Sequence, residues 1–342
     1  MLWERDRSTE GFSYMENGST EVPSIEFTNM SRVFGDTRAV DDLSFKVFPG
    51  EVFGFIGPNG AGKTTSMRIL ATLDMPSSGD ALVDGLSVID DPDRVRRRLG
   101  FMPDQFGVYP NVTCEEYLDF FARSYGLKGS DRRQCLNEVM AFTQLDRIAQ
   151  KPMNGLSKGM QQRLCLSRTL IHNPSVLILD EPAAGLDPRA RIELRDMIVA
   201  LGEMGKTLLI SSHILSELAE VCHRVGIIEQ GQLLAVGTVD EILEGKVGQR
   251  VEDENQALSG TSVLITVVGN VSACVEFLKS KKGVDPQETT ETTVTIACPS
   301  EPQDQADLLS ELVRVGIPVA GFQVKQRSLE EAFLHVTQGR VQ

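Results

Sequence analysis

The sequence has 342 residues, of which 41% are hydrophobic and 24% are charged, the balance of a folded globular chain. Lysine and arginine number 34 against 48 aspartates and glutamates, so the formal net charge is −14. This acidity argues against nucleic acid as a partner, because such binding relies on neutralising phosphates. The sequence shows neither an apolar run near the roughly 18 to 20 residues of a membrane span nor a secretory signal at its start. We therefore expect a cytoplasmic chain of about two domains.

The composition changes along the chain and predicts four segments. Residues 1–22 are polar and too poor in apolar side chains to pack, so we expect a disordered extension. Residues 23–243 alternate short apolar runs with helical patterns, and residues 244–260 form a polar linker before a small α/β domain over residues 261–342. The 6 cysteines lack CxxC spacing, which favours reduced, packed thiols over a disulfide framework or a zinc site.

Short runs that are apolar on both faces predict a buried parallel sheet covered by helices. The clearest strands are residues 52–56, 176–179, 207–211 and 225–229. Gln230 and Gly231 follow the last of these and predict a hairpin that closes the sheet.

Residues 104–160 have a helical pattern instead, and we interpret them as an inserted helical subdomain. Thr113 and Glu116 form a capping box at the start of one of its helices.

The last domain shows a mixed pattern without a motif to which chemistry can be attached. Its predicted strands are residues 262–268, 293–297 and 321–325, and its predicted helices are residues 271–281, 304–315 and 329–337. Ser328 and Glu331 cap the last of these helices. Docking or stabilisation is the simplest role for this domain.

Residues 57–64 (GPNGAGKT) match the phosphate-binding loop GxxxxGK[ST] in full. The loop follows the apolar run 52–56 and precedes a helical run over residues 64–73, which is the context that the motif requires. Its backbone N–H groups would converge on phosphate oxygens at a helix N-terminus. Lys63 would supply a cation to the β and γ phosphates, and Thr64 a hydroxyl to Mg²⁺. The sequence therefore predicts a site for a nucleoside triphosphate.

A second motif follows the apolar run 176–179, which ends in Asp180 and Glu181. In a nucleotide hydrolase the first acid holds Mg²⁺ and the second polarises the attacking water. Alone, such a strand end is a weak signal, but together with a phosphate-binding loop it predicts hydrolysis.

Three further motifs resemble those of one known family. Residues 156–163 (LSKGMQQR) resemble the signature motif of ATP-binding cassette (ABC) ATPases, residues 185–188 (GLDP) resemble their D-loop, and Ser212-His213 resembles their switch histidine. Residues 328–334 and 106–110 resemble bacterial ABC exporter ATPases of the antibiotic-resistance and sodium-efflux type. The resemblance implies an α/β P-loop domain with a parallel-sheet core, an antiparallel β portion and an inserted helical subdomain, followed by the small α/β domain.

The resemblance also implies a role for each matching residue. Catalysis would fall to Glu181, His213 and Asp104, and Mg²⁺ would be held by Thr64 and Asp180. The residues it assigns to ATP are Phe34, Gly57, Pro58, Asn59, Gly60, Ala61, Gly62, Lys63, Thr64, Thr65, Ser157, Gly159 and Asp187. Ser157 and Gly159 would close over ATP held by a second subunit, so hydrolysis would require a dimer.

Two positions depart from the family pattern. Asp104 stands where the family usually has the Q-loop glutamine, and Gln105 comes next, so either residue could serve there. Lys158 replaces a small residue of the signature motif, which predicts an altered contact with the partner subunit.

Three functions are compatible with these motifs. The leading hypothesis is the ATPase subunit of an exporter, docked on an integral-membrane permease at the inner face of the cell membrane through the helical subdomain. A non-transport ABC ATPase of translation or DNA maintenance would usually bring tandem cassettes, long coiled coils or zinc modules, and the sequence shows one cassette. A P-loop kinase would leave the signature and switch-histidine motifs unexplained. The transported substrate, and the choice between a homodimer and two different ATPases, stay open.

Overall fold

The computed structural model describes residues 22–105, 107–214, 218–243, 261–281, 284–297 and 302–326. The chain forms two compact units that divide near Leu234, and each is described by itself. Within the described residues, no helix combines the length and apolar character needed to cross a membrane.

The first unit is built on a six-stranded sheet in the order β10-β9-β3-β8-β7-β6. The pairs β3/β8, β3/β9, β7/β8 and β6/β7 are parallel, as the apolar runs predicted. The strands are β3 (Val52–Ile56), β6 (Leu99–Met102), β7 (Val176–Asp180), β8 (Thr207–Ser212), β9 (Arg224–Glu229) and β10 (Gln232–Thr238). Gln230 and Gly231 both have positive φ, which suits a tight hairpin between β9 and β10.

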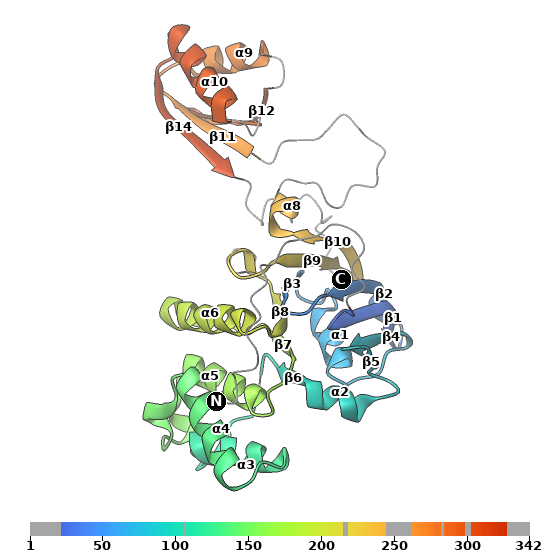
Figure 1. The fold of residues 1–342 in the computed structure, drawn as a ribbon. Coiled ribbons are helices and arrows are strands. Elements are labelled where there is room, and N and C mark those ends of the chain that lie inside the picture. The colour runs from blue at the N-terminus through green and yellow to red at the C-terminus, as the bar shows by residue number, and fades with distance from the viewer. Residues whose placement is uncertain are drawn as a thin grey trace. The chain divides into compact units, whose positions relative to one another are not determined.

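A four-stranded antiparallel sheet in the order β2-β1-β4-β5 packs beside this core (Figure 1). Its strands are β1 (Ile25–Phe34), β2 (Thr37–Val47), β4 (Ser78–Val83) and β5 (Leu86–Ser87). Phe45 of β2 stacks on Phe53 of β3 with 5.0 Å between ring centroids, and on Phe27 of β1 with 4.7 Å. This aromatic stack joins the two sheets at β3, the strand that leads into the phosphate-binding loop.

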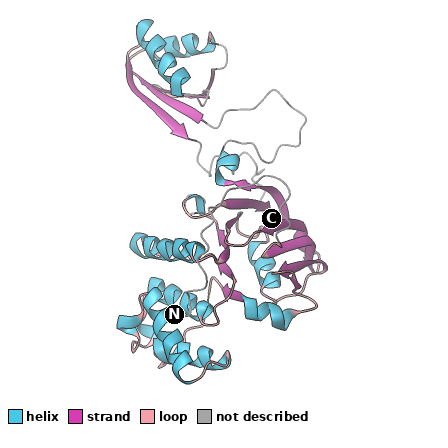
Figure 2. Cartoon of the chain, viewed as in Figure 1, coloured by secondary structure: helices cyan, strands magenta, loops and turns pink. Residues whose placement is uncertain are grey.

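Figures 1 and 2 show the helices of the first unit, of which those between β6 and β7 gather apart from the strands and the one that follows the phosphate-binding loop lies beside them. They are α1 (Lys63–Leu70), α2 (Pro92–Arg98), α3 (Cys114–Ser124), α4 (Gly129–Phe142), α5 (Lys158–Leu170) and α6 (Pro188–Glu203), with 3₁₀ turns at Asp146–Ile148 and Met153–Gly155. The capping box is present: the Thr113 hydroxyl accepts the Glu116 N–H, and the Glu116 carboxylate accepts the Thr113 N–H at 2.8 Å. The parallel core, antiparallel portion and helical region together confirm the predicted fold class.

The second unit contains α8 (Val239–Leu243) and a four-stranded antiparallel sheet in the order β12-β13-β11-β14. Its other elements are β11 (Thr261–Val267), α9 (Val271–Lys279), β12 (Asp285–Thr289), β13 (Thr293–Ala297), α10 (Pro302–Arg314) and β14 (Val319–Gln326). The β-α-β-β-α-β order is a split βαβ arrangement, with both helices packed on a core that includes Val263, Ile265 and Ile296. Strand β12 was missed by the sequence analysis, and the helix predicted over residues 329–337 lies outside the described residues.

Candidate functional site

The phosphate-binding loop turns from β3 into α1, and its glycines meet different demands. A Cβ on Gly57 would lie 2.3 Å from the carbonyl oxygen of Ile228 in β9. Gly60 has φ +83 with open space around it, whereas Gly62 combines φ +103 with a Cβ position 2.5 Å from the carbonyl oxygen of Ala39. Two of the three glycines are therefore required by packing against protein as well as by the loop conformation.

Lys63 lies almost fully buried at the base of this loop, with 5% of its surface exposed. Its Nζ donates to the carbonyl oxygens of Gly57 at 2.6 Å and Pro58 at 3.2 Å, and it lies 3.6 Å from Oε1 of Glu181. Burial lowers the pKa of Lys63, while the carboxylates of Glu181 and Asp180 oppose that fall. The partners of this ammonium are thus two backbone carbonyl oxygens and one carboxylate, and phosphate oxygens can replace them.

Asp180 ends β7 and is 1% exposed. Ser211 donates a hydrogen bond to its Oδ1 at 2.6 Å, and the side chain of Thr64 is also hydrogen-bonded to it. Burial raises the pKa of Asp180, the two hydrogen bonds lower it, and the charges of Glu181 and Asp104 raise it further. Asp180 is therefore hydrogen-bonded to the Thr64 hydroxyl and lies near enough to Glu181 and Asp104 for their charges to act on it.

Glu181 leaves the strand with φ 48, a left-handed conformation that is uncommon for a residue other than glycine. Its N–H donates to Oγ of Ser211 at 2.9 Å, and its Oε2 lies 2.7 Å from Nδ1 of His213. The carboxylate therefore stands between the Lys63 ammonium and the His213 ring, 14% exposed.

A cavity of about 240 Å³ opens over the phosphate-binding loop. It is lined by Ala39, Pro58, Asn59, Gly60, Ala61, Gly62, Lys63, Thr64, Thr65, Asp104 and Glu181. Most of the residues predicted to bind ATP thus meet at one place, together with Ala39, which sequence reasoning missed because it lies in β2 outside every motif.

Seven predicted site residues do not line this cavity. Three of them, Gly57, Asp180 and His213, contact side chains that do. The other four are Phe34, Ser157, Gly159 and Asp187. Phe34 is 45% exposed at the end of β1, with the guanidinium of Arg32 4.3 Å from its ring centroid. Ser157 and Asp187 cap the N-termini of α5 and α6, accepting backbone N–H bonds at 3.4 and 3.0 Å. A Cβ on Gly159 would lie 2.8 Å from that of Ala190, so the starts of these two helices pack closely.

Lys158, the residue that departs from the signature pattern, lies close to Gly185. Nζ of Lys158 lies 2.6 Å from the position that a Cβ on Gly185 would take, and Gly185 has φ +68. Lys158 therefore lies over the D-loop of the same chain.

The donor set fits Mg²⁺ and ATP. Carboxylate and hydroxyl oxygens from Asp180 and Thr64 suit this hard cation, which proteins usually hold with one or two carboxylates together with substrate phosphates. The residues described here contain no group of three or more His, Cys, Asp or Glu side chains arranged to hold a metal unaided. The Lys63 ammonium and the converging loop N–H groups suit the phosphates.

Comparison with known proteins places this site in a family. The ABC transporter family model matches residues 40–184. The Nod factor export ATP-binding protein I of Burkholderia thailandensis is 38% identical over 227 residues, which cover 66% of this chain and 75% of that protein. The chain belongs to the ABC transporter family. The predicted recognition as an ABC exporter ATPase is thereby confirmed, and family membership implies ATP binding and hydrolysis.

Two further similarities differ in how much of the chain they cover. The linearmycin resistance ATP-binding protein LnrL of Bacillus subtilis is 29% identical over 315 residues, which cover 92% of this chain and 98% of that protein. One similar solved structure is that of the ATP-binding cassette MJ0796, a dimer in a post-hydrolysis state bound to ADP and Pi. Its sequence is 26% identical to this chain, and the TM-score is 0.57. The match covers 63% of this chain and 98% of the MJ0796 chain. The similarity to LnrL therefore extends through both units.

Proposed function

We propose that this chain is the ATP-hydrolysing subunit of a membrane exporter, in which two copies close over two ATP molecules and drive substrate through a separate permease. One observation carries the catalytic part: Lys63, Glu181 and His213 form a continuous set of contacts beside Asp180 and the phosphate-binding loop. The relatives named for export and resistance favour transport over a role in translation or DNA maintenance.

The proposed division of labour follows from these contacts. Lys63 exchanges its carbonyl partners for phosphate oxygens when ATP binds, which releases Glu181 from the ion pair. Glu181 then accepts a proton from the attacking water, and His213 holds the carboxylate and contacts the γ-phosphate. Mg²⁺, held by Asp180 and Thr64, would neutralise charge on the β and γ phosphates. Asp104, which lines the cavity, is our candidate for the Q-loop position, with Gln105 as the alternative.

The dimer is proposed from the residues that lie outside the cavity. Ser157 and Gly159 stand at the N-terminus of α5, where backbone N–H groups favour an anion, yet the cavity of the same chain does not include them. A second copy would bring its own phosphates to this helix end, as the dimeric state of MJ0796 suggests by analogy.

The permease surface is proposed on the helical region after Asp104. Tyr109, Phe120 and Tyr125 are exposed by 56, 65 and 47%, and Tyr109 and Phe120 belong to one chain of ring contacts through Tyr117 and Phe121. Exposed aromatic groups of this kind are typical of interaction surfaces. A permease docked there would hold the chain at the cytoplasmic face of the membrane.

The test of the ATPase uses Glu181→Gln in the full chain, with Glu203→Gln, an exposed carboxylate at the end of α6, as the matched control. We expect Glu181→Gln to bind ATP with wild-type affinity, to lose turnover by about 10²- to 10⁴-fold, and to form a stable dimer in ATP by light scattering. Near-normal hydrolysis by Glu181→Gln would refute the assignment.

The test of the permease uses a tagged chain purified from gently solubilised membranes of the source organism, beside the Phe120→Asp variant. We expect a polytopic membrane protein in stoichiometric yield with the wild type and its loss with Phe120→Asp, because a charge on this surface opposes burial. Soluble partners alone would move the proposal to a non-transport ATPase.

A further inference from the structure

We propose that Ser211 is a positioning residue for hydrolysis, whose hydroxyl fixes the carboxylate of Asp180 and the backbone of Glu181 at the same time. The inference rests on the proposed roles of those two acids. It assigns a function to a strand residue that belongs to none of the motifs in the sequence.

The position of Ser211 follows from the strand order. Strand β8 lies between β3, which leads into the phosphate-binding loop, and β7, which ends in the acids. Ser211 pairs with Asp180 on one side and with Phe55 on the other. Because the three strands are parallel, their carboxyl ends meet at one edge of the sheet, and Ser211 lies at that edge between the two halves of the site.

The hydroxyl makes two hydrogen bonds, which together use its donor and one of its acceptor sites. It donates to Oδ1 of Asp180 at 2.6 Å and accepts the N–H of Glu181 at 2.9 Å. Ser211 is 0% exposed, so both hydrogen bonds are shielded from water in this packing. Removal of this one oxygen therefore leaves a buried carboxylate without one donor and a partly buried N–H without its acceptor.

The hydrogen bond from the Glu181 N–H to Ser211 stabilises an uncommon backbone conformation at Glu181. Glu181 has φ 48, and a non-glycine residue keeps such a conformation only where its surroundings hold it. The Glu181 N–H has turned out of the β7 ladder and is held by Ser211 instead. The direction of the Glu181 side chain, and with it the contact to His213, therefore depends on the Ser211 hydroxyl.

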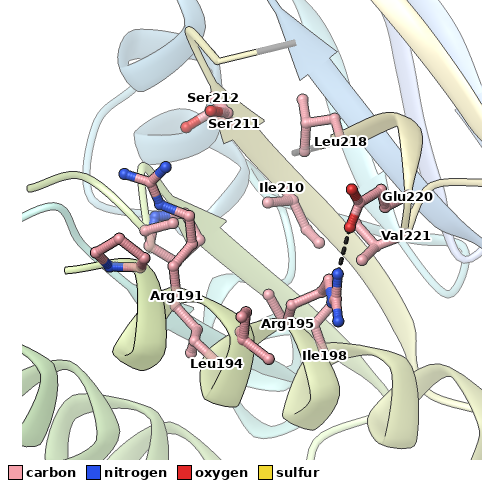
Figure 3. Close-up of a pocket in the computed structure, with 14 residues that line it drawn as sticks. Arg191, Leu194, Arg195, Ile198, Ile210, Ser211, Ser212, Leu218, Glu220 and Val221 are labelled. Atoms are coloured by element: carbon pink, nitrogen blue, oxygen red, sulfur yellow. Dashed lines mark hydrogen bonds and ion pairs between the residues drawn. The ribbon is translucent and has the colours of Figure 1, made fainter. Parts of the chain in front are cut away.

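Space beside Ser211 permits a conservative replacement. A cavity of about 380 Å³ is bordered by Ser211 and Ser212 of β8, by Ile210, and by residues of α6 such as Arg191 and Leu194 (Figure 3). A threonine at position 211 can keep the hydroxyl, and its extra methyl group suits a β-strand.

The experiment compares Ser211→Ala and Ser211→Thr in the purified full chain with a control for lost stability. Ser167→Ala is the matched control, because Ser167 is also 0% exposed and its hydroxyl also makes two hydrogen bonds, to Thr143 and to the carbonyl oxygen of Arg163. Measurements are the melting temperature, ATP affinity without Mg²⁺, kcat, and the Mg²⁺ concentration for half-maximal turnover.

For Ser211→Ala we expect kcat to fall on the order of 10- to 100-fold, the range for a lost hydrogen bond to a charged group. The Mg²⁺ requirement rises, while ATP affinity without Mg²⁺ stays near that of the wild type because Lys63 and the loop are intact. Ser211→Thr restores kcat, and Ser167→Ala lowers the melting temperature with kcat unchanged.

Three results would overturn the inference. A Ser211→Ala chain with wild-type kcat, a folded Ser211→Thr chain without recovery, or a Ser167→Ala chain with the same loss of kcat would each exclude a positioning role while the ATPase itself stands. A wild-type chain without Mg²⁺-dependent hydrolysis would instead refute the proposed function, and this inference with it.

Discussion

Replacing Gly57 by alanine tests whether the first glycine of the phosphate-binding loop is required for packing against the sheet as well as for nucleotide binding. The new Cβ would lie 2.3 Å from the carbonyl oxygen of Ile228 and 2.9 Å from its Cγ2, whereas real Cβ contacts stay above 3.0 Å. Because the carbonyl belongs to the backbone of β9, the loop itself has to move by at least about 0.7 Å, beyond the roughly 0.5 Å within which a site keeps its geometry.

The consequences can be estimated from this displacement. Overpacking against a rigid strand destabilises a protein by about 1–3 kcal/mol. A misplacement near 1 Å costs about 10²-fold in rate. We therefore expect Gly57→Ala to lower the midpoint of unfolding and to reduce kcat/KM for ATP on the order of 100-fold.

Gly60→Ala is the matched control in the same loop. Gly60 has a positive φ but no atom within 4 Å of its Cβ position, so only the backbone conformation is penalised. That penalty is roughly 1–2 kcal/mol, offset in part by about 0.4–1 kcal/mol from the stiffer unfolded chain. Thermal unfolding by circular dichroism and steady-state ATPase assays compare the two variants. If both variants lose the same stability and activity, the contact with Ile228 does not explain why position 57 requires glycine.

Two further predictions concern the periphery of the site and the buried thiols. Phe34→Ala should weaken ATP binding by about 1–3 kcal/mol, as expected for a lost stacking face, and Phe34→Tyr should retain the affinity. Titration with ATP measures both variants. An affinity of Phe34→Ala equal to that of the wild type would exclude stacking. Burial raises the pKa of both Cys135 and Cys165 to about 11. Because the thiolate is the reactive form, iodoacetamide should leave both residues unmodified in the native chain at pH 8 and should modify both in urea. Their reactivity should rise as the pH approaches 11. Mass spectrometry measures the labelling, and modification of either residue in the native chain at pH 8 would contradict this prediction.

The four strands that the sequence predicted in the parallel core lie within one residue of their observed bounds, whereas β6 was not predicted. Residues 52–56 form β3 with the same bounds, because every side chain of that strand is buried and the apolar run ends where the strand ends. The hairpin at Gln230 and Gly231 was also predicted, since a tight turn needs residues that accept positive φ. Local pattern and tertiary structure agree at these positions.

The missed features depend on contacts that a local pattern does not contain. Residues 285–289 (DPQET) carry no apolar alternation, and their place in the sheet comes from pairing with β13. In the sequence, Ser211 is only the polar residue at the end of an apolar run. Its two hydrogen bonds depend on the register in which β8 pairs with β7, and a local pattern does not contain that register. Ala39 borders the cavity through the approach of β2 to the loop, which no spacing along the chain encodes.

The strand order explains how motifs distant in sequence act at one point. Strands β3, β8, β7 and β6 are neighbours with parallel pairing, so the segments that leave their carboxyl ends carry Lys63, His213, Glu181 and Asp104 to the same edge. The relative heights of these groups are set by register: Asp180 opposite Ser211, and Ile56 opposite Ser212. A substitution that weakens β8 at this edge should therefore disturb the acids and the histidine together while the phosphate-binding loop, anchored on β3 and α1, keeps its affinity for ATP. Loss of turnover with retained nucleotide binding is accordingly the signature expected for changes in β8, and loss of both is the signature expected for changes at Gly57 or Gly62.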